Sequence, residues 1–142
     1  MSGEENKAVV RRLIEKGING GDDKVIEEIV APGFKSREGE SVHALGIEGF
    51  KELATTLHTA FPDGRLVIED MIAEGDKVVI WAYFTGTHQG PLEGIPPTGK
   101  RVKVIDVDLY RLENGKVVES WAHMDELGMM QQLGVTGGEE EH

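Results

Sequence analysis

The chain has 142 residues and no cysteine, and its 26 acidic against 15 basic side chains give a formal net charge of −11. This length suits one domain with its own core, while the charge excludes a nucleic-acid partner and the missing cysteines exclude disulfides and a thiol nucleophile. No window approaches the roughly 18 apolar residues of a membrane span, and the charged start has no apolar stretch typical of a secretory signal. We therefore expect a cytoplasmic protein that binds a hydrophobic small molecule and no membrane.

The first half of the chain is predicted to form helices. Apolar residues recur at helical spacing over residues 4–18, and a second, short helix is predicted between a cap at Asp22 or Asp23 and Pro32. A short extended piece is expected near Phe34, followed by a loop over residues 36–46. A third helix is predicted to begin near Ile47 and to end at the sequence "FPDG".

The second half is predicted to be an antiparallel sheet. Four apolar segments are separated by the turn "GD", a loop rich in Pro and Gly, and the hairpin turn "NG", and a last helical turn follows. Helices followed by a meander indicate the α+β class, with the helices packed on one side of the sheet. We predict one domain over residues 1–142, in which residues 136–142 form a polar, disordered tail. The expected strands are 65–74, 77–88, 100–113 and 116–125.

The "NG" turn at residues 114–115 places acidic and aromatic side chains together. If it is a two-residue type I′ turn, pairing outward places Asp108 opposite Trp121 and Asp106 opposite His123. Alternation of side chains then puts Asp125 and Tyr110 on the same face. If the turn is instead a type I turn with a G1 bulge, the register slips by one residue and the aspartates move away from His123 and Asp125.

Two interpretations of this acidic face remain open. It can be the solvated side of a half-exposed sheet, with Ile105, Val107 and Leu109 forming the core on the other side. Alternatively, the carboxylates and the imidazole line a pocket walled by aromatic and aliphatic side chains. In the second case burial raises the pKa of a carboxyl group, which then suits general acid–base catalysis near neutral pH.

The sequence gives less support to a role for His88 in the site and to a metal site. His88 ends a strand at a glycine-rich loop, where it either lies at the surface or reaches the mouth of the pocket. Carboxylates and an imidazole could hold a divalent ion, but no compact ligand spacing such as HExxH occurs. We predict no metal and no cofactor.

The order of several motifs resembles that of SnoaL-like polyketide cyclases in the nuclear transport factor 2-like superfamily. These motifs include "GIEGFKEL", "FTGTHQG", "GIPPTGKRV", "DLYRLENGKVVESW" and "DELGMMQQLG", and the resemblance runs from about Glu4 to Val135. It implies a cone-shaped α+β barrel in which a curved sheet wraps around the N-terminal helices and encloses a pocket. It also implies a homodimer formed through the sheet.

The resemblance further implies an intramolecular aldol ring closure without metal or cofactor. Asp125 matches the family's general acid/base at the end of the last strand, and Asp108 and His123 would support it. His88 matches a histidine of the family's "TGTH" segment, and the predicted pocket adds Trp121, Tyr110, Phe84 and Asp106 as substrate-binding residues, although the family often has a small residue at the position of Asp106. Two alternatives remain: isomerisation or dehydration of a steroid-like or small ring compound, and non-catalytic binding of a lipophilic ligand.

Overall fold

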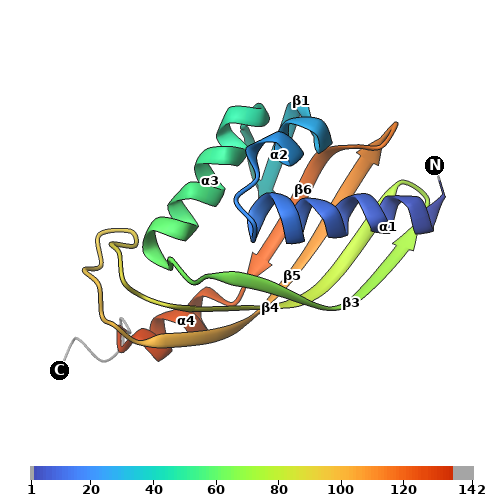
Figure 1. The fold of residues 1–142 in the computed structure, drawn as a ribbon. Coiled ribbons are helices and arrows are strands. Elements are labelled where there is room, and N and C mark those ends of the chain that lie inside the picture. The colour runs from blue at the N-terminus through green and yellow to red at the C-terminus, as the bar shows by residue number, and fades with distance from the viewer. Residues whose placement is uncertain (1, 136–142) are drawn as a thin grey trace.

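Helices pack against one face of a curved, six-stranded sheet in the computed structural model, which describes residues 2–135 (Figure 1). The predicted tail at residues 136–142 lies outside the described residues. The α+β class and the helices-first order are confirmed. The elements are α1 (Gly3–Arg12), the π-helical segment η1 (Leu13–Ile18), α2 (Asp23–Ile29), β1 (Val30–Glu38), β2 (Ser41–Ala44), α3 (Gly46–Ala60), β3 (Arg65–Glu74), β4 (Lys77–Thr87), β5 (Arg101–Glu113), β6 (Lys116–Met124) and α4 (Glu126–Leu133).

The first helices begin at strong caps and bury one apolar stripe. Ser2 and Glu5 form a capping box at the start of α1, and the Asp22 side chain accepts the amide hydrogens of the first turn of α2. The stripe predicted over residues 4–18 is confirmed, because Val10 and Leu13 are fully buried. The predicted helix is continuous, but its last turn is wound as η1.

The sheet has the strand order β2-β1-β6-β5-β4-β3. Consecutive strands from β3 to β6 pair antiparallel as predicted, whereas β1 pairs parallel with β6. β1 precedes the meander in the chain and β6 ends it. The meander therefore brings its last strand beside β1, and the two strands run in the same direction. It brings the end of β1 beside the end of β6.

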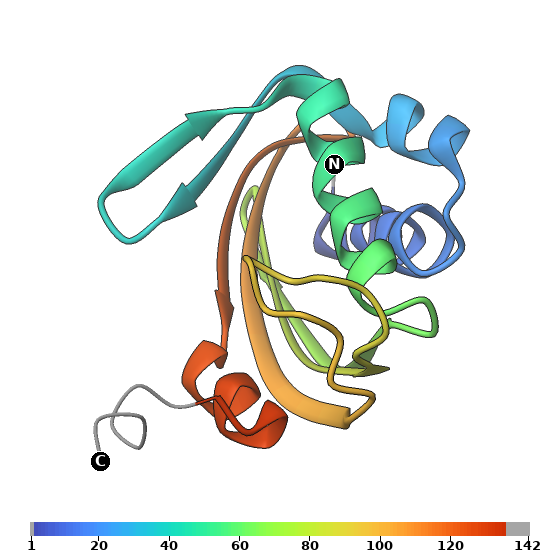
Figure 2. The same ribbon diagram turned by 90° about the vertical axis from the view of Figure 1, so that its left-hand side faces the viewer.

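The predicted loop over residues 36–46 is wrong. β1 continues through Glu38, turns at Gly39 and Glu40, and pairs with β2, so this segment is a hairpin that projects beyond the sheet (Figure 2). All four residues of β2 are exposed. The polar and apolar residues of β2 alternate over only four positions, Ser41–Ala44, which is the shortest run that can indicate a strand.

The two faces of the sheet have different environments. α1, α2 and α3 cover the concave face, and the core forms between them and the even-numbered residues of β4 and β5 (Figures 1 and 2). The odd-numbered residues of these strands lie on the uncovered convex face. Within residues 2–135, no helix has the length and apolarity needed to cross a bilayer.

Candidate functional site

A one-residue bulge in β6 decides which side chains enter the concave side. The two-residue turn is confirmed, because Asn114 and Gly115 both have positive φ and Glu113 faces Lys116. Beyond Val117, however, Val118 has no partner on β5, and the pairing resumes one residue later with Glu119. The turn was therefore predicted correctly, and the register beyond it was not.

The bulge separates the residues that were expected to lie together. Asp108 lies opposite Ala122 rather than Trp121, and Asp106 lies opposite Met124 rather than His123. Because each residue of β6 beyond the bulge points to the opposite face from that predicted, Trp121 and His123 leave the face that carries the aspartates.

Asp106 and Asp108 are buried on the concave face of β5, each with only 4% of its surface exposed. They are neighbours on one side of the strand, and their carboxyl groups lie close enough for each to change the pKa of the other. Tyr110 follows on the same side, and its hydroxyl donates to Asp108 Oδ2 at 3.5 Å. The Oδ1 atom of each aspartate is buried without any hydrogen-bond partner. Each of these oxygens therefore lacks the hydrogen bond that a buried carboxyl oxygen normally makes.

Burial changes the protonation of this acid pair. Loss of hydration raises the pKa of Asp108 well above its usual value, and the neighbouring charge and hydrogen bond of Asp106 raise it further. Burial also raises the pKa of Asp106, although the hydrogen bond with Asp108 and the charge of His123 oppose that rise. Burial likewise raises the pKa of Tyr110, which keeps its hydroxyl proton for donation. The pair thus combines a carboxyl group that retains its proton with one that releases it more readily.

The acid pair lines a cavity of about 230 Å³ between α3 and the concave face, which we call the inner chamber. Its polar surface comes from β1, β5 and β6, and its apolar surface comes mainly from α3. The lining residues are Ile18, Phe34, Ser36, Phe50, Leu53, Ala54, Leu57, Leu66, Asp106, Asp108, Tyr110, Ser120, Ala122 and Met124.

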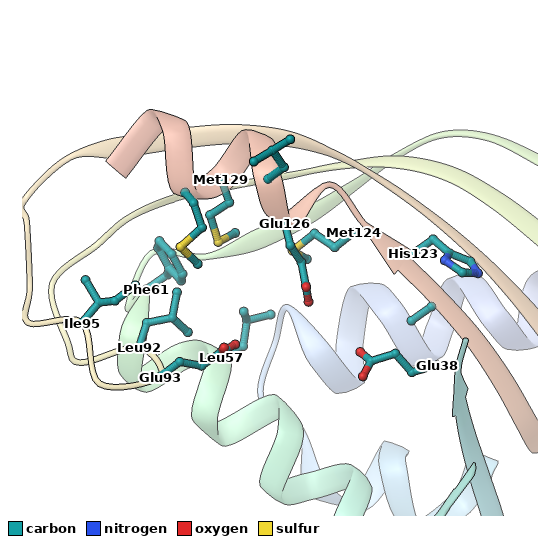
Figure 3. Close-up of a pocket in the computed structure, with 13 residues that line it drawn as sticks. Glu38, Leu57, Phe61, Leu92, Glu93, Ile95, His123, Met124, Glu126 and Met129 are labelled. Carbon is teal, nitrogen blue, oxygen red and sulfur yellow. The ribbon is translucent and has the colours of Figure 1, made fainter. Parts of the chain in front are cut away.

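A larger cavity of about 650 Å³, the outer chamber, lies between α4, the end of α3 and the loop that follows β4 (Figure 3). Phe61, Leu92, Ile95 and Met129 form an apolar wall, whereas Glu38, Glu93 and Glu126 bring carboxylates to the same space. Three residues line both chambers: Leu57, Ala122 and Met124. The remaining residues of the outer chamber are His123, Leu127 and Met130.

The expectation that Asp125 lies in a dry pocket is wrong. Asp125 is exposed, lines neither chamber and caps α4, where its Oδ1 accepts the amide hydrogen of Gly128 at 2.9 Å. Its position directly before an eight-residue helix explains this role. The sequence "DELG" indicates a helix start as well as it indicates an acid.

Trp121 and His123 do not join the acid pair. Trp121 points to the convex face, where the Arg37 guanidinium lies 5.6 Å from the centre of its ring. His123 is exposed and lies at the edge of the outer chamber, with its ring turned away from the apolar wall (Figure 3). Of the residues predicted to share one face, only Asp106, Asp108 and Tyr110 come together in the inner chamber.

Phe84 and His88 are core residues rather than chamber walls. Phe84 packs edge-on against Phe61, and neither Phe84 nor His88 lines either chamber. His88 is fully buried and lines neither chamber, so both positions considered for it, at the surface and at the mouth of the pocket, are wrong. Its Nδ1 accepts the amide hydrogen of Thr98 at 3.2 Å, which fixes the loop whose Leu92 and Ile95 form part of the outer chamber.

Several chamber residues were missed by sequence reasoning. Ser36 belongs to the segment predicted as a loop, and Ser120 and Ala122 point inward only because of the bulge at Val118. Correct placement of the bulge would have identified both residues of β6. Among residues 2–135, no group of three His, Asp or Glu side chains is arranged to hold a metal ion.

The chain is similar to known proteins over nearly its whole length. Residues 8–133 match the family model of the SnoaL-like polyketide cyclases. The chain is 32% identical over 131 residues to aklanonic acid methyl ester cyclase DnrD of Streptomyces peucetius, which covers 89% of this chain and 88% of that protein. The corresponding enzyme DauD of Streptomyces sp. strain C5 is also 32% identical and is covered over 80% of its length.

Solved structures agree with this similarity. A protein of Jannaschia sp. CCS1 classed as a SnoaL-like polyketide cyclase superposes with a TM-score of 0.85 at 34% identity, over 94% of both chains. AclR of Streptomyces galilaeus, classed as a hydroxylase, superposes with a TM-score of 0.83 at 29% identity, over 94% of this chain and 98% of AclR. One fold therefore carries more than one assigned chemistry among these relatives.

Proposed function

Because the chain belongs to the SnoaL-like polyketide cyclase family, we propose that it is a cyclase whose acid–base pair is Asp106 and Asp108. The observation that carries this proposal is the burial of both carboxyl groups beside a cavity, each with one oxygen free of any partner. The role expected for Asp125 passes to Asp108, since only the latter faces a chamber. No metal or cofactor has a step in this proposal.

The proposed reaction is an intramolecular aldol ring closure. The Asp106 carboxylate takes a proton from the carbon next to a carbonyl group, and the resulting enolate carbon forms a bond with a second carbonyl carbon of the same molecule. Protonated Asp108 gives its proton to the oxygen of that second carbonyl, which becomes a hydroxyl group. Asp106 then passes the proton to Asp108, which lies beside it in the same chamber, so the pair is regenerated.

The outer chamber favours an uncharged, largely apolar substrate. Its volume of about 650 Å³ lies within the range of small-molecule sites, and its wall is aliphatic, aromatic and thioether in character. Glu38, Glu93 and Glu126 would repel a carboxylate or phosphate group at the entrance. The ester named for the related enzyme DnrD, aklanonic acid methyl ester, is therefore a rational first substrate to assay.

Replacement of Asp108 by Asn tests the proposed function. We expect the Asp108→Asn variant to keep its fold and to lose about 10²- to 10⁴-fold in kcat for ring closure of that ester. The matched control is Asp125→Asn, which preserves a helix-capping side chain and should keep kcat within about threefold of the wild type. Unchanged ring closure in the Asp108→Asn variant would refute the assignment.

We also propose that two copies of the chain pair through the convex face of the sheet. Apolar side chains on this face are partly exposed, and the most exposed are Ile72 at 63% and Trp81 at 47%. Ile72 faces Val79 across the β3–β4 pair, and Trp81 faces Val107 across the β4–β5 pair, so the apolar surface is continuous. A contiguous apolar sheet surface of this kind marks a site of protein association.

A further inference from the structure

The two chambers are adjacent, because Leu57, Ala122 and Met124 are the residues of the described part of the chain that line both. Leu57 belongs to α3, whereas Ala122 and Met124 belong to β6. Ala122 lies opposite Asp108 on β5, so its small side chain stands directly beside the acid pair. It is exposed although it points to the concave side, because the space next to it is open.

The inner chamber is small compared with the outer one. An apolar cavity of about 150 Å³ holds one benzene ring, and the inner chamber of about 230 Å³ therefore accommodates a single ring or a short chain. A fused system of three rings exceeds this volume but fits the outer chamber of about 650 Å³. A polycyclic molecule can thus present only one narrow part of itself to the aspartates.

From this geometry we propose that Leu57, Ala122 and Met124 form a passage between the two chambers, and that Ala122 determines specificity there by admitting only a single ring or a flexible arm to the acid pair. The preferred substrate has a bulky apolar body, which stays in the outer chamber, and a narrow reactive arm with carbonyl or hydroxyl groups. Those groups meet the carboxyl groups of Asp106 and Asp108, which line the inner chamber. This inference rests on the proposed function for its catalytic meaning, but binding alone can test it.

The test follows two neutral probes of different size by NMR. Phenol represents one ring and 9-phenanthrol represents three fused rings. Protein labelled with ¹³C at the aspartate carboxyl carbons and the methionine methyl groups reports on both chambers at once. In the wild type, phenol should shift the signals of Asp106 and Asp108, whereas 9-phenanthrol should shift those of Met129 and Met130 and leave both carboxyl signals unchanged.

Enlargement of Ala122 should close the passage. In the Ala122→Leu variant we expect phenol to lose at least about tenfold in affinity for the inner chamber, while 9-phenanthrol still shifts the methyl signals of Met129 and Met130 in the outer chamber. Leu127→Phe is the matched control, because it adds apolar volume in the outer chamber away from the passage. If Ala122→Leu does not fold, Leu57→Phe narrows the same passage from the helix side.

Two outcomes overturn the inference: phenol still shifts the carboxyl signals when the passage is filled, or 9-phenanthrol reaches them in the wild type. Neither outcome depends on turnover. If Asp108→Asn is inactive but phenol still reaches the aspartates in Ala122→Leu, the acid–base assignment is retained and only the specificity role is removed. If Asp108→Asn is fully active but Ala122→Leu blocks phenol, the specificity role is retained and the acid–base assignment is removed.

Discussion

The two faces of β5 contrast in an instructive way. On the concave face, Asp106 and Asp108 are almost fully buried, whereas on the convex face Ile105 is 37% exposed. This is the opposite of the usual arrangement, in which polar residues face water and aliphatic residues face the core. Buried carboxyl groups carry a cost in free energy, and exposed apolar groups remain available for association. A protein retains both when each face has a function beyond stability.

The largest effect is expected from a change that exchanges the two faces. Deletion of Val118 removes the bulge in β6, so Trp121 and His123 would turn inward and Ala122 would turn outward. We expect the free energy of unfolding to fall by more than about 4 kcal/mol, because two large side chains would crowd the aspartates. Urea denaturation measures this loss.

Val118→Ala is the control for that deletion, since it keeps the bulge and shortens one half-buried side chain. It should cost about 1 kcal/mol. A deletion variant as stable as Val118→Ala would mean that the strand forms a new bulge elsewhere, and the position of the present bulge would then carry no special weight.

The same bulge marks the limit of what the sequence predicts. Helix stripes, caps and the "NG" turn depend on local chemistry, so the helices, the limits of β3 to β6 to within about one residue, and the first pairs of the hairpin were predicted correctly. The bulge has no such local signal: Val118 is an ordinary strand residue with a valine before it. Because the side-chain period of a strand is two, this single residue was enough to misplace Trp121 and His123.

The burial of Asp106 and Asp108 also could not be predicted from local sequence patterns alone. Alternation along β5 separates Asp106 and Asp108 from Ile105 and Val107, but it does not say which set the helices cover. Resemblance to the cyclase family favoured a pocket, and the packing of α3 over the concave face accounts for it. Asp125 was misplaced for a different reason, since an acid before a helix satisfies both a capping pattern and a family motif.

The next largest effect is expected from a substitution on the convex face, at the proposed dimer surface. Trp81→Glu places a charge in the middle of the proposed dimer surface, and we expect the dimer dissociation constant to rise by more than about 100-fold, or about 2.7 kcal/mol. Sedimentation equilibrium measures this constant. Leu127→Glu is the control, because Leu127 is also exposed but lies on α4 beside the outer chamber. Equal association of all three proteins would exclude pairing through this face.

The buried aspartates of the concave face should make the free energy of unfolding depend on pH. Burial raises the folded-state pKa of Asp106 and of Asp108, so the folded protein holds protons that the unfolded chain releases. Their contribution is complete below the unfolded pKa of about 4 and is lost as the pH rises through each folded pKa. The slope is at most about 1.4 kcal/mol per pH unit for each proton.

Urea denaturation between pH 4 and pH 8 measures this slope. The Asp106→Asn, Asp108→Asn double variant should lack the acid-stabilised component, and its stability relative to the wild type should increase with pH. Glu126→Gln removes an exposed carboxyl group of the outer chamber and should follow the wild-type curve. Parallel curves for the wild type and the double variant would show that the pair gains no protons on folding.

The smallest effect is expected at Asp125, which belongs to neither face. Asp125→Ala removes the cap of α4 and should lower the free energy of unfolding by about 1 kcal/mol, whereas Asp125→Ser should recover most of that loss. Both variants should keep the kcat of the wild type within about threefold, because the carboxyl group lies outside both chambers. A 100-fold loss of kcat in Asp125→Ser with normal stability would instead place the reacting groups at the start of α4, since serine restores the cap but no acid.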